Sequence, residues 1–128
     1  MIVDTSAVVA VLFREPGFDA VLDKLVSAPR LAIGSPTLAE TALVVSARLK
    51  RDGRGMIARF TQEASVAVVP FSEAHVATAV GAWLRFGKGR HRAALNFGDC
   101  LTYSVARIAE EPLLCVGNDF AMTDLEIA

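Results

Sequence analysis

The sequence has little of several features that mark particular protein classes. Its two cysteines, Cys100 and Cys115, form neither a disulfide framework nor a close metal-binding pair, and free cysteines suit a reducing cytoplasm. Apolar runs such as residues 7–13 are far too short to span a membrane. The N-terminus lacks a basic region followed by an apolar stretch, so no secretory signal is visible. We therefore expect a soluble protein of the cytoplasm.

Net charge is also nearly absent, because 13 Lys and Arg residues stand against 14 Asp and Glu residues, which gives −1. Such a chain does not attract nucleic acid as a whole, so any binding of that kind must come from a local patch. Apolar residues make up 53% of the 128 residues, which argues against disorder and supports a real hydrophobic core. The length predicts a single domain over residues 1–128.

Short apolar runs alternate with helical patterns, which predicts an α/β fold with a mainly parallel sheet. Strands are predicted at residues 1–3, 31–33, 66–69 and 113–116, with a short edge strand at 124–127. Helices are predicted at residues 5–13, 18–26, 35–51, 54–63, 72–86 and 98–109. The inward stripe expected for helix 72–86 is Val76, Ala79, Val80 and Trp83.

Three carboxylates, Asp4, Glu40 and Asp99, lie in apolar surroundings that have little other use for a charge. Asp4 follows the first strand, at the edge where open α/β sheets bind ligands, although Asp-Thr-Ser is also a good helix cap. Glu40 falls on the apolar face of its helix, where a buried charge needs a partner or a metal. The start at Ser35-Pro36 places Glu40 too late to close a capping box with Thr37.

Asp99 begins a helix, where a negative charge is favourable even without a function. Gly98 before it would allow another group to approach the backbone closely. One turn further on, Thr102 and Tyr103 are either hydrogen-bond donors behind the acids or core residues, and Tyr103 fits the core better. If the three acids meet, their mutual repulsion is costly unless a cation neutralises it. The sequence therefore raises the question of a metal site.

No acidic residue occurs from His75 through Gly98, a stretch that contains a glycine-rich loop at 87–92. Its basic side chains are Arg85, Lys88, Arg90, His91 and Arg92. Most short basic runs are solvated surface, but arginine also matches phosphate geometry, and the glycines permit close approach. These five residues are candidate contacts to a nucleic-acid phosphate backbone, which is RNA if the resemblance described next holds. His91 fits a phosphate or base contact better than a catalytic base, because nothing in the sequence supplies a partner to orient it.

Together these segments resemble a PIN-domain ribonuclease, and more narrowly a VapC-type toxin of a type II toxin–antitoxin pair. The matching segments are 1–7 (MIVDTSA), 38–41 (LAET), 87–93 (GKGRHRA), 95–100 (LNFGDC), 112–114 (PLL), 118–120 (NDF) and 123–124 (TD). Their order and spacing cover essentially the whole chain, and the stretch from 87 to 100 is the most specific part.

The resemblance implies a three-layer α/β/α sandwich with a mainly parallel central sheet, and RNA cleavage that depends on Mg²⁺ or Mn²⁺. It also implies a homodimer that is inhibited by a separate VapB-type antitoxin. Asp4, Glu40 and Asp99 match the main acids of the family. Asp4 and Asp99 are the expected metal ligands, and Glu40 would bind through water or orient the nucleophile.

Many family members carry a fourth acid at the position that Gly117 occupies in this chain. Asp119 is the expected replacement and completes the predicted catalytic set, where it would support a second ion; the alternative is a weak fourth position, with one ion in place of two. Asp124 is the weaker alternative. Other groups either hydrogen-bond to the acids or phosphate or only start helices, namely Thr5, Ser6 and Asn96.

Two other functions compete with the nuclease. A phospho-acceptor receiver-type domain is also α/β with clustered acids, but it has adjacent acids after the first strand and a late lysine. Here Asp4 stands alone and no lysine follows Lys88. A non-catalytic RNA- or protein-binding module that kept the PIN fold would be recognised by the loss of an acid, and all three main acids are present.

Overall fold

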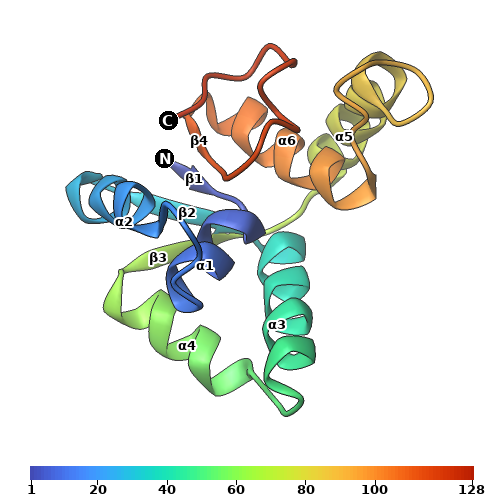
Figure 1. Cartoon of the computed structure of the whole chain (residues 1–128). Coiled ribbons are helices and arrows are strands. Elements are labelled where there is room, and N and C mark those ends of the chain that lie inside the picture. The colour runs from blue at the N-terminus through green and yellow to red at the C-terminus, as the bar shows by residue number, and fades with distance from the viewer.

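The computed structural model describes residues 1–128 and contains four strands and six helices (Figure 1). The strands are β1 (Ile2–Val3), β2 (Leu31–Gly34), β3 (Val66–Val69) and β4 (Leu113–Leu114). The helices are α1 (Thr5–Leu12), α2 (Phe18–Ser27), α3 (Ser35–Leu49), α4 (Arg54–Glu63), α5 (Glu73–Phe86) and α6 (Phe97–Ala109). All strand pairs are parallel and the order is β3-β2-β1-β4, which confirms the predicted sandwich.

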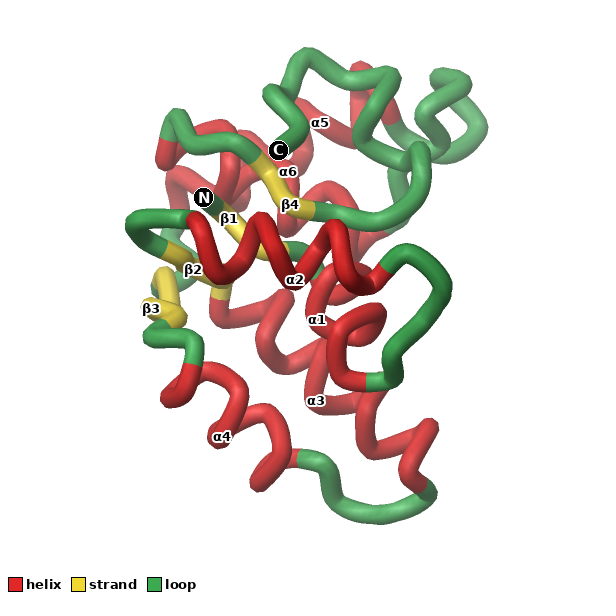
Figure 2. Tube along the Cα trace, turned by 60° about the vertical axis from the view of Figure 1, so that its left-hand side comes forward, coloured by secondary structure: helices red, strands yellow, loops and turns green.

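Alternation along the short strands divides the apolar residues between the two faces of the sheet. Ile2 and Leu113 join the core beneath α5 and α6, whereas Val3 and Leu114 join the core beneath α1, α2, α3 and α4. Figures 1 and 2 both show α5 and α6 on the side of the strands away from α2 and α4. The sheet is thus a layer between two separate hydrophobic cores.

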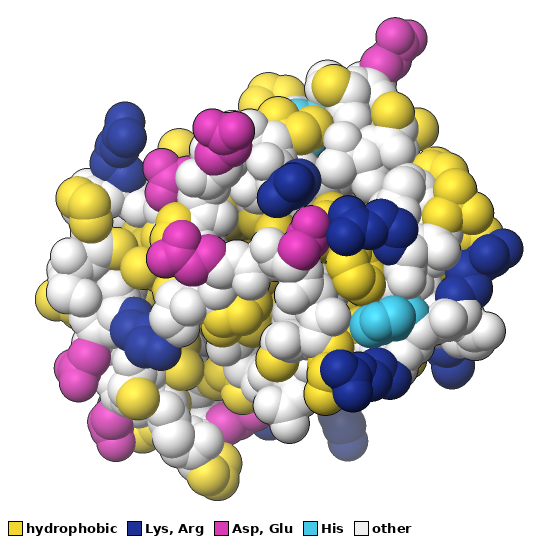
Figure 3. All heavy atoms as spheres, turned by 90° about the horizontal axis from the view of Figure 1, so that it is seen from above, with side chains coloured by type: hydrophobic (Ala, Val, Ile, Leu, Met, Phe, Trp, Pro, Cys, Tyr) yellow, Lys and Arg dark blue, Asp and Glu magenta, His cyan; other side chains and the backbone are white.

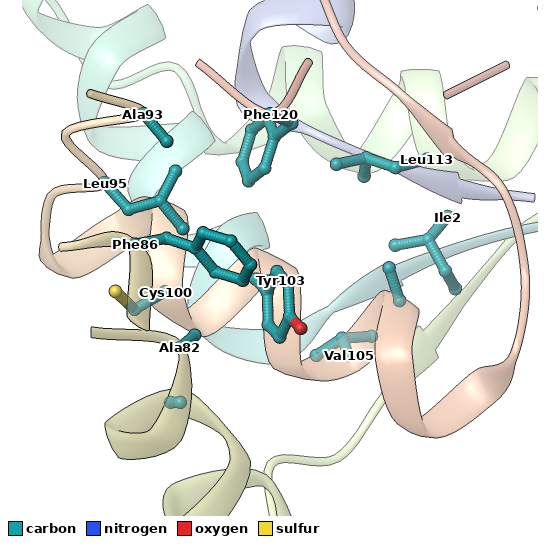
Figure 4. Close-up of a cluster of buried hydrophobic side chains, with 12 residues drawn as sticks. Ile2, Ala82, Phe86, Ala93, Leu95, Cys100, Tyr103, Val105, Leu113 and Phe120 are labelled. Atoms are coloured by element: carbon teal, nitrogen blue, oxygen red, sulfur yellow. The ribbon is translucent and has the colours of Figure 1, made fainter. Parts of the chain in front are cut away.

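The core beneath α5 and α6 fixes the segment that leads into α6. The rings of Phe86 and Tyr103 lie 5.9 Å apart in the middle of this cluster (Figure 4). Leu95 is fully buried beside them, and its N–H donates to the Phe86 carbonyl at 2.9 Å. The glycine-rich basic loop is therefore anchored at its far end, just before the start of α6.

The inward stripe expected for α5 is wrong at three of its four positions. Val76, Val80 and Trp83 are 52%, 53% and 43% exposed, and only Ala79 is buried. The face in the core consists of His75, Ala79, Ala82 and Phe86. Small alanines let α5 pack closely against α6, so packing and not hydrophobicity selects the inner face. None of the helices has both the length and the apolar character needed to cross a bilayer.

Two further expectations about strands differ from the structure. β4 ends at Leu114 and not at Val116, because the Val116 N–H donates to the Ser6 hydroxyl at 2.9 Å and leaves the ladder. No strand forms at 124–127, where a single bridge joins Ile127 to Leu113. Residues 126–128 still cover the edge of β4, since the Leu113 N–H donates to the Glu126 carbonyl at 2.9 Å and the Ala128 N–H donates to the Leu113 carbonyl at 2.8 Å.

Candidate active site

The chain order of the strands reverses beside β1, and this is where the acids gather. From β1 the chain continues to β2 and β3 and then returns to place β4 on the other side of β1. Open α/β sheets bind ligands at the carboxyl ends of the strands at such a point. Asp4 follows β1 directly, and Asp119 lies five residues beyond the end of β4.

Asp4 caps α1 and also lies at the carboxyl edge of the sheet, directly after β1. It is 8% exposed, and its Oδ2 accepts from the Ser6 N–H at 3.0 Å and from the Ser6 hydroxyl at 2.6 Å. Its Oδ1 accepts from the Thr102 hydroxyl at 3.2 Å. Capping α1 therefore uses one carboxylate oxygen and does not exclude a second role for the other.

Asp99 closes a capping box at the start of α6. Its Oδ2 accepts from the Asn96 N–H at 2.9 Å, and the Asn96 side chain accepts from the Asp99 N–H at 2.8 Å. Burial raises the pKa of Asp99 to about 6, and the Asn96 hydrogen bond opposes that rise. The negative charges of Asp119, Asp4 and Glu40 raise the same pKa further. Carboxylates from three other segments thus lie near enough to act on Asp99.

Glu40 differs from its expected burial, because it lies exposed beside the buried stripe of α3, which consists of Thr37, Thr41 and Val45. The helix begins after Gly34, so Glu40 closes no capping box. Its carboxylate lies against Gly98. A methyl group built on Gly98 would come within 3.2 Å of the Glu40 Cδ and would overlap its Oε2. Gly98 thus provides the close approach that brings Glu40 to the first turn of α6.

The two candidates for the fourth acid are separated by the fold. Asp119 is exposed, and its charge contributes to the raised pKa of Asp99. Asp124 lies elsewhere, because its carboxylate accepts from the Tyr103 hydroxyl at 2.6 Å and pairs with Arg85 at 3.3 Å. Of the two, only Asp119 is an electrostatic neighbour of Asp99.

Cys115 is a residue of this edge that the sequence analysis did not single out. Burial, followed by the charges of Asp4 and Asp119, raises the pKa of its thiol to about 11, so the thiol stays neutral. No signal in the sequence pointed to it, because the strand predicted at 113–116 enclosed Cys115, whereas β4 ends just before it, at Leu114.

The five basic candidates are held in different ways. Arg85 pairs with Asp124 and lies 4.6 Å from the ring centroid of Phe86, and Arg90 lies 4.2 Å from that of Trp83. His91 accepts through Nδ1 from the Ala93 N–H at 3.1 Å, which supplies the orienting partner that the sequence did not reveal.

The other two basic side chains are free, since Lys88 and Arg92 are exposed and form no ion pair. Figure 3 shows Lys and Arg side chains gathered around a histidine on one side of the face seen from above. Within the loop, these two free cations are the most available to an anionic ligand.

The acids fit a hydrated hard cation better than a closed metal cage. No three Asp, Glu, His or Cys side chains lie close enough together to hold a metal ion by themselves. Mg²⁺ prefers oxygen ligands, keeps several waters and often binds only one or two protein carboxylates. The helix caps occupy Oδ2 of Asp4 and Asp99 and leave the capacity of each Oδ1. Burial is the largest cause of the rise in the Asp99 pKa, and the charges of Asp119, Asp4 and Glu40 add to it, so a nearby cation would offset this added repulsion.

Comparison with known proteins agrees with this geometry. The model of the PIN domain family matches residues 1–125. Ribonuclease VapC36 of Mycobacterium tuberculosis is 48% identical over 127 residues, which cover 98% of this chain and 91% of that protein. Among solved structures, M. tuberculosis VapC20, described as a sarcin–ricin loop cleaving toxin, has a TM-score of 0.80 at 18% identity and covers 99% and 97% of the two chains. A toxin–antitoxin complex from Klebsiella pneumoniae gives 0.73 at 16% identity, with 99% and 95% covered.

Proposed function

The chain belongs to the PIN domain family and, within it, to the VapC ribonucleases, and on this premise we propose that it is a toxin that hydrolyses RNA phosphodiester bonds with a divalent cation, Mg²⁺ or Mn²⁺. Residues 1–128 would form one nuclease unit that acts in the cytoplasm and stops growth by blocking translation. The observation that supports this most strongly is the position of Asp4, Glu40 and Asp119 near Asp99, whose pKa their negative charges raise, at the carboxyl edge of β1 and β4.

Each acid has a role that its surroundings support. Asp4 and Asp99 would hold the cation, since each keeps oxygen capacity after capping its helix. Glu40 would orient the attacking water, because it is exposed and yet reaches the start of α6 beside Gly98. Asp119 would add negative charge on the β4 side. A bound divalent cation would neutralise these acids, lower the pKa of a bound water and stabilise charge at the phosphate.

The basic loop would hold the RNA backbone next to these acids. Lys88 and Arg92 have no competing carboxylate, so they would contact phosphates directly. Arg90 and His91 would play a smaller part, because Trp83 and the loop backbone already engage them. Arg85 is the weakest of the five candidates, since Asp124 neutralises it. Such contacts position the substrate without reading its sequence.

Two protein partners belong to the proposal. The likeness to a toxin–antitoxin complex supports a separate VapB-type antitoxin. A homodimer is supported by the apolar outer face of α5, where Val76, Val80 and Trp83 border a groove of about 670 Å³ that runs to Phe97. Phe97 is 80% exposed, which is unusual for a large apolar side chain that has no partner. A twofold dimer would bury the same patch on both subunits.

The decisive experiment is incubation of the purified protein with total RNA, with and without EDTA, followed by mapping of the cut ends. Asp4→Asn and Asp99→Asn should each lower metal-dependent cleavage at least about a hundredfold, because several kcal/mol of electrostatic stabilisation are lost. Asp124→Asn is the control, since this acid is held by Tyr103 outside the cluster, and cleavage should persist. Asp119→Asn then tests the fourth acid.

Cleavage that survives EDTA, or that Asp4→Asn leaves intact, would contradict the proposal. A folded chain that binds RNA without ever cutting it would favour the alternative of a non-catalytic RNA- or protein-binding module. The relatives give that alternative no support, since proteins 37% to 48% identical to this chain are named ribonucleases.

A further inference from the structure

A layer of buried threonine hydroxyls lies behind the acids. Thr102 and Thr37 are 2% and 4% exposed, and their hydroxyl oxygens lie 2.9 Å apart. Thr102 also contacts Asp4, which joins α6 to the segment after β1. No buried side-chain nitrogen or oxygen in the structure lacks a partner, so this layer is fully satisfied. Side chains from three separate elements therefore meet in one continuous row of hydrogen bonds.

The proton positions in this row follow from counting donors. An ionised carboxylate only accepts, so Thr102 must donate to the Asp4 Oδ1. A hydroxyl has a single proton, so Thr102 has none left for its other neighbour. Thr37 must then donate to Thr102 across their 2.9 Å contact. The row runs in one direction, from Thr37 through Thr102 to Asp4.

The same counting shows which oxygen of Asp4 is available to a ligand. A carboxylate offers about four lone-pair sites, two on each oxygen. The Oδ2 accepts from both the backbone and the hydroxyl of Ser6, at 3.0 Å and 2.6 Å, so its sites are filled. The Oδ1 accepts only from Thr102, at 3.2 Å, and retains one site. Thr102 thus restrains the one oxygen of Asp4 that remains able to bind a cation.

We propose that Thr102 and Thr37 are positioning residues that hold the Asp4 Oδ1 in place for the divalent cation. The inference rests on the proposed function, in which Asp4 is a metal ligand. Thr102 lies one helical turn beyond Asp99, and Thr37 lies one turn before Glu40. The row of hydroxyls therefore also sets the spacing between the two helices that carry the other acids. Hydrogen-bond partners of metal ligands commonly contribute 10- to 100-fold, roughly, to metal affinity.

The test measures Mn²⁺ binding to the RNA-free protein by calorimetry, alongside thermal unfolding of each variant. Thr102→Val keeps the shape of the side chain and removes the hydroxyl, and it should weaken Mn²⁺ binding about tenfold or more. Thr102→Ser restores the donor and should return the affinity to near that of the unmodified protein. Thr37→Val leaves the contact between Thr102 and Asp4 in place and should cause a smaller loss, about threefold.

The matched control is Thr41→Val, because Thr41 is 1% exposed and its hydroxyl donates to the Thr37 carbonyl at 2.7 Å without touching Asp4 or Thr102. This variant should lose stability but retain Mn²⁺ affinity. The proposal is overturned if Thr102→Val binds Mn²⁺ as tightly as the unmodified protein, or if Thr41→Val loses as much affinity. It is also overturned if Thr102→Val fails to fold and Thr37→Val binds normally.

Failure of the proposed function looks different. In that case the unmodified protein binds no Mn²⁺, or Asp4→Asn binds it equally well, whatever the threonine variants do.

Discussion

Gly98→Ala should separate catalysis from stability in this protein. The added methyl group would overlap the Glu40 Oε2 and lie 3.2 Å from its Cδ. Glu40 must then retreat by roughly 1 Å to reach an ordinary van der Waals distance. Because the Glu40 side chain is exposed and flexible, this movement costs little folding free energy. Replacing a helical glycine by alanine gains up to about 1 kcal/mol, so the variant should be at least as stable.

The cleavage rate should respond in the opposite direction. A displacement of about 1 Å in a group that orients a reactant can cost about 100-fold in rate. We therefore expect Gly98→Ala to cut RNA 10- to 100-fold, roughly, more slowly, while its unfolding temperature stays level or rises. The measurements are initial rates of cleavage at saturating Mg²⁺ and thermal unfolding without metal.

Gly55→Ala is the control for Gly98→Ala. Gly55 is also the second residue of its helix, α4, but a methyl group there meets nothing within 4 Å. It should gain similar stability and keep its full rate. In a Glu40→Ala background, Gly98→Ala should have no further effect on rate, because the group that it displaces is gone. An undiminished rate in the single variant would refute the contact as a catalytic requirement.

Three other predictions concern charge and assembly. The pKa of Asp99 is about 6 in the folded protein against an ordinary 3.8, so the folded state binds the proton of this carboxyl group more tightly than the unfolded state does. In metal-free protein, the free energy of unfolding should therefore fall as pH rises from about 4 to about 6. Denaturant titrations should show this fall and its absence in Asp99→Asn. Arg92→Gln should lower the salt slope of RNA binding by about one unit, whereas Arg51→Gln, exposed at the turn after α3, should not. Val80→Asp should convert a dimer to monomers in sedimentation, and Val26→Asp, on a residue of α2 that is 78% exposed, should leave it intact.

Local signals in the sequence predict most of this fold, because they depend on neighbouring residues alone. The start of α3 at Ser35 and the bounds of α4 follow from caps and breakers close by. The inner face of α5 could not be predicted in this way, since both of its sides are apolar. Only contact with α6 selects Ala79 and Ala82 over Val76 and Val80.

In the candidate site, too, local sequence signals place some of the residues, and only tertiary contacts place the others. Asp4 and Asp99 stand at the end of a strand and the start of a helix, so sequence could place them at one edge. Sequence could not distinguish Asp119 from Asp124, because the difference arises from Tyr103, a residue of α6 that holds Asp124 away from the cluster. The exposure of Glu40 was also invisible, since it depends on how α3 is turned against the rest of the molecule. The catalytic roles of all these acids stay predictions.

The double duty of Asp4 and Asp99 has an evolutionary consequence. Asparagine begins helices about as well as aspartate does, so either acid can become an amide and leave its helix start satisfied. A single substitution of aspartate by asparagine could therefore inactivate the enzyme and leave its fold intact. An inactive variant of this kind could still bind the antitoxin proposed above. It would then lower the amount of free antitoxin that is available to inhibit active copies of the toxin. In genomes that encode many related chains, the positions that correspond to Asp4 and Asp99 should therefore be checked for asparagine before each copy is counted as an active toxin.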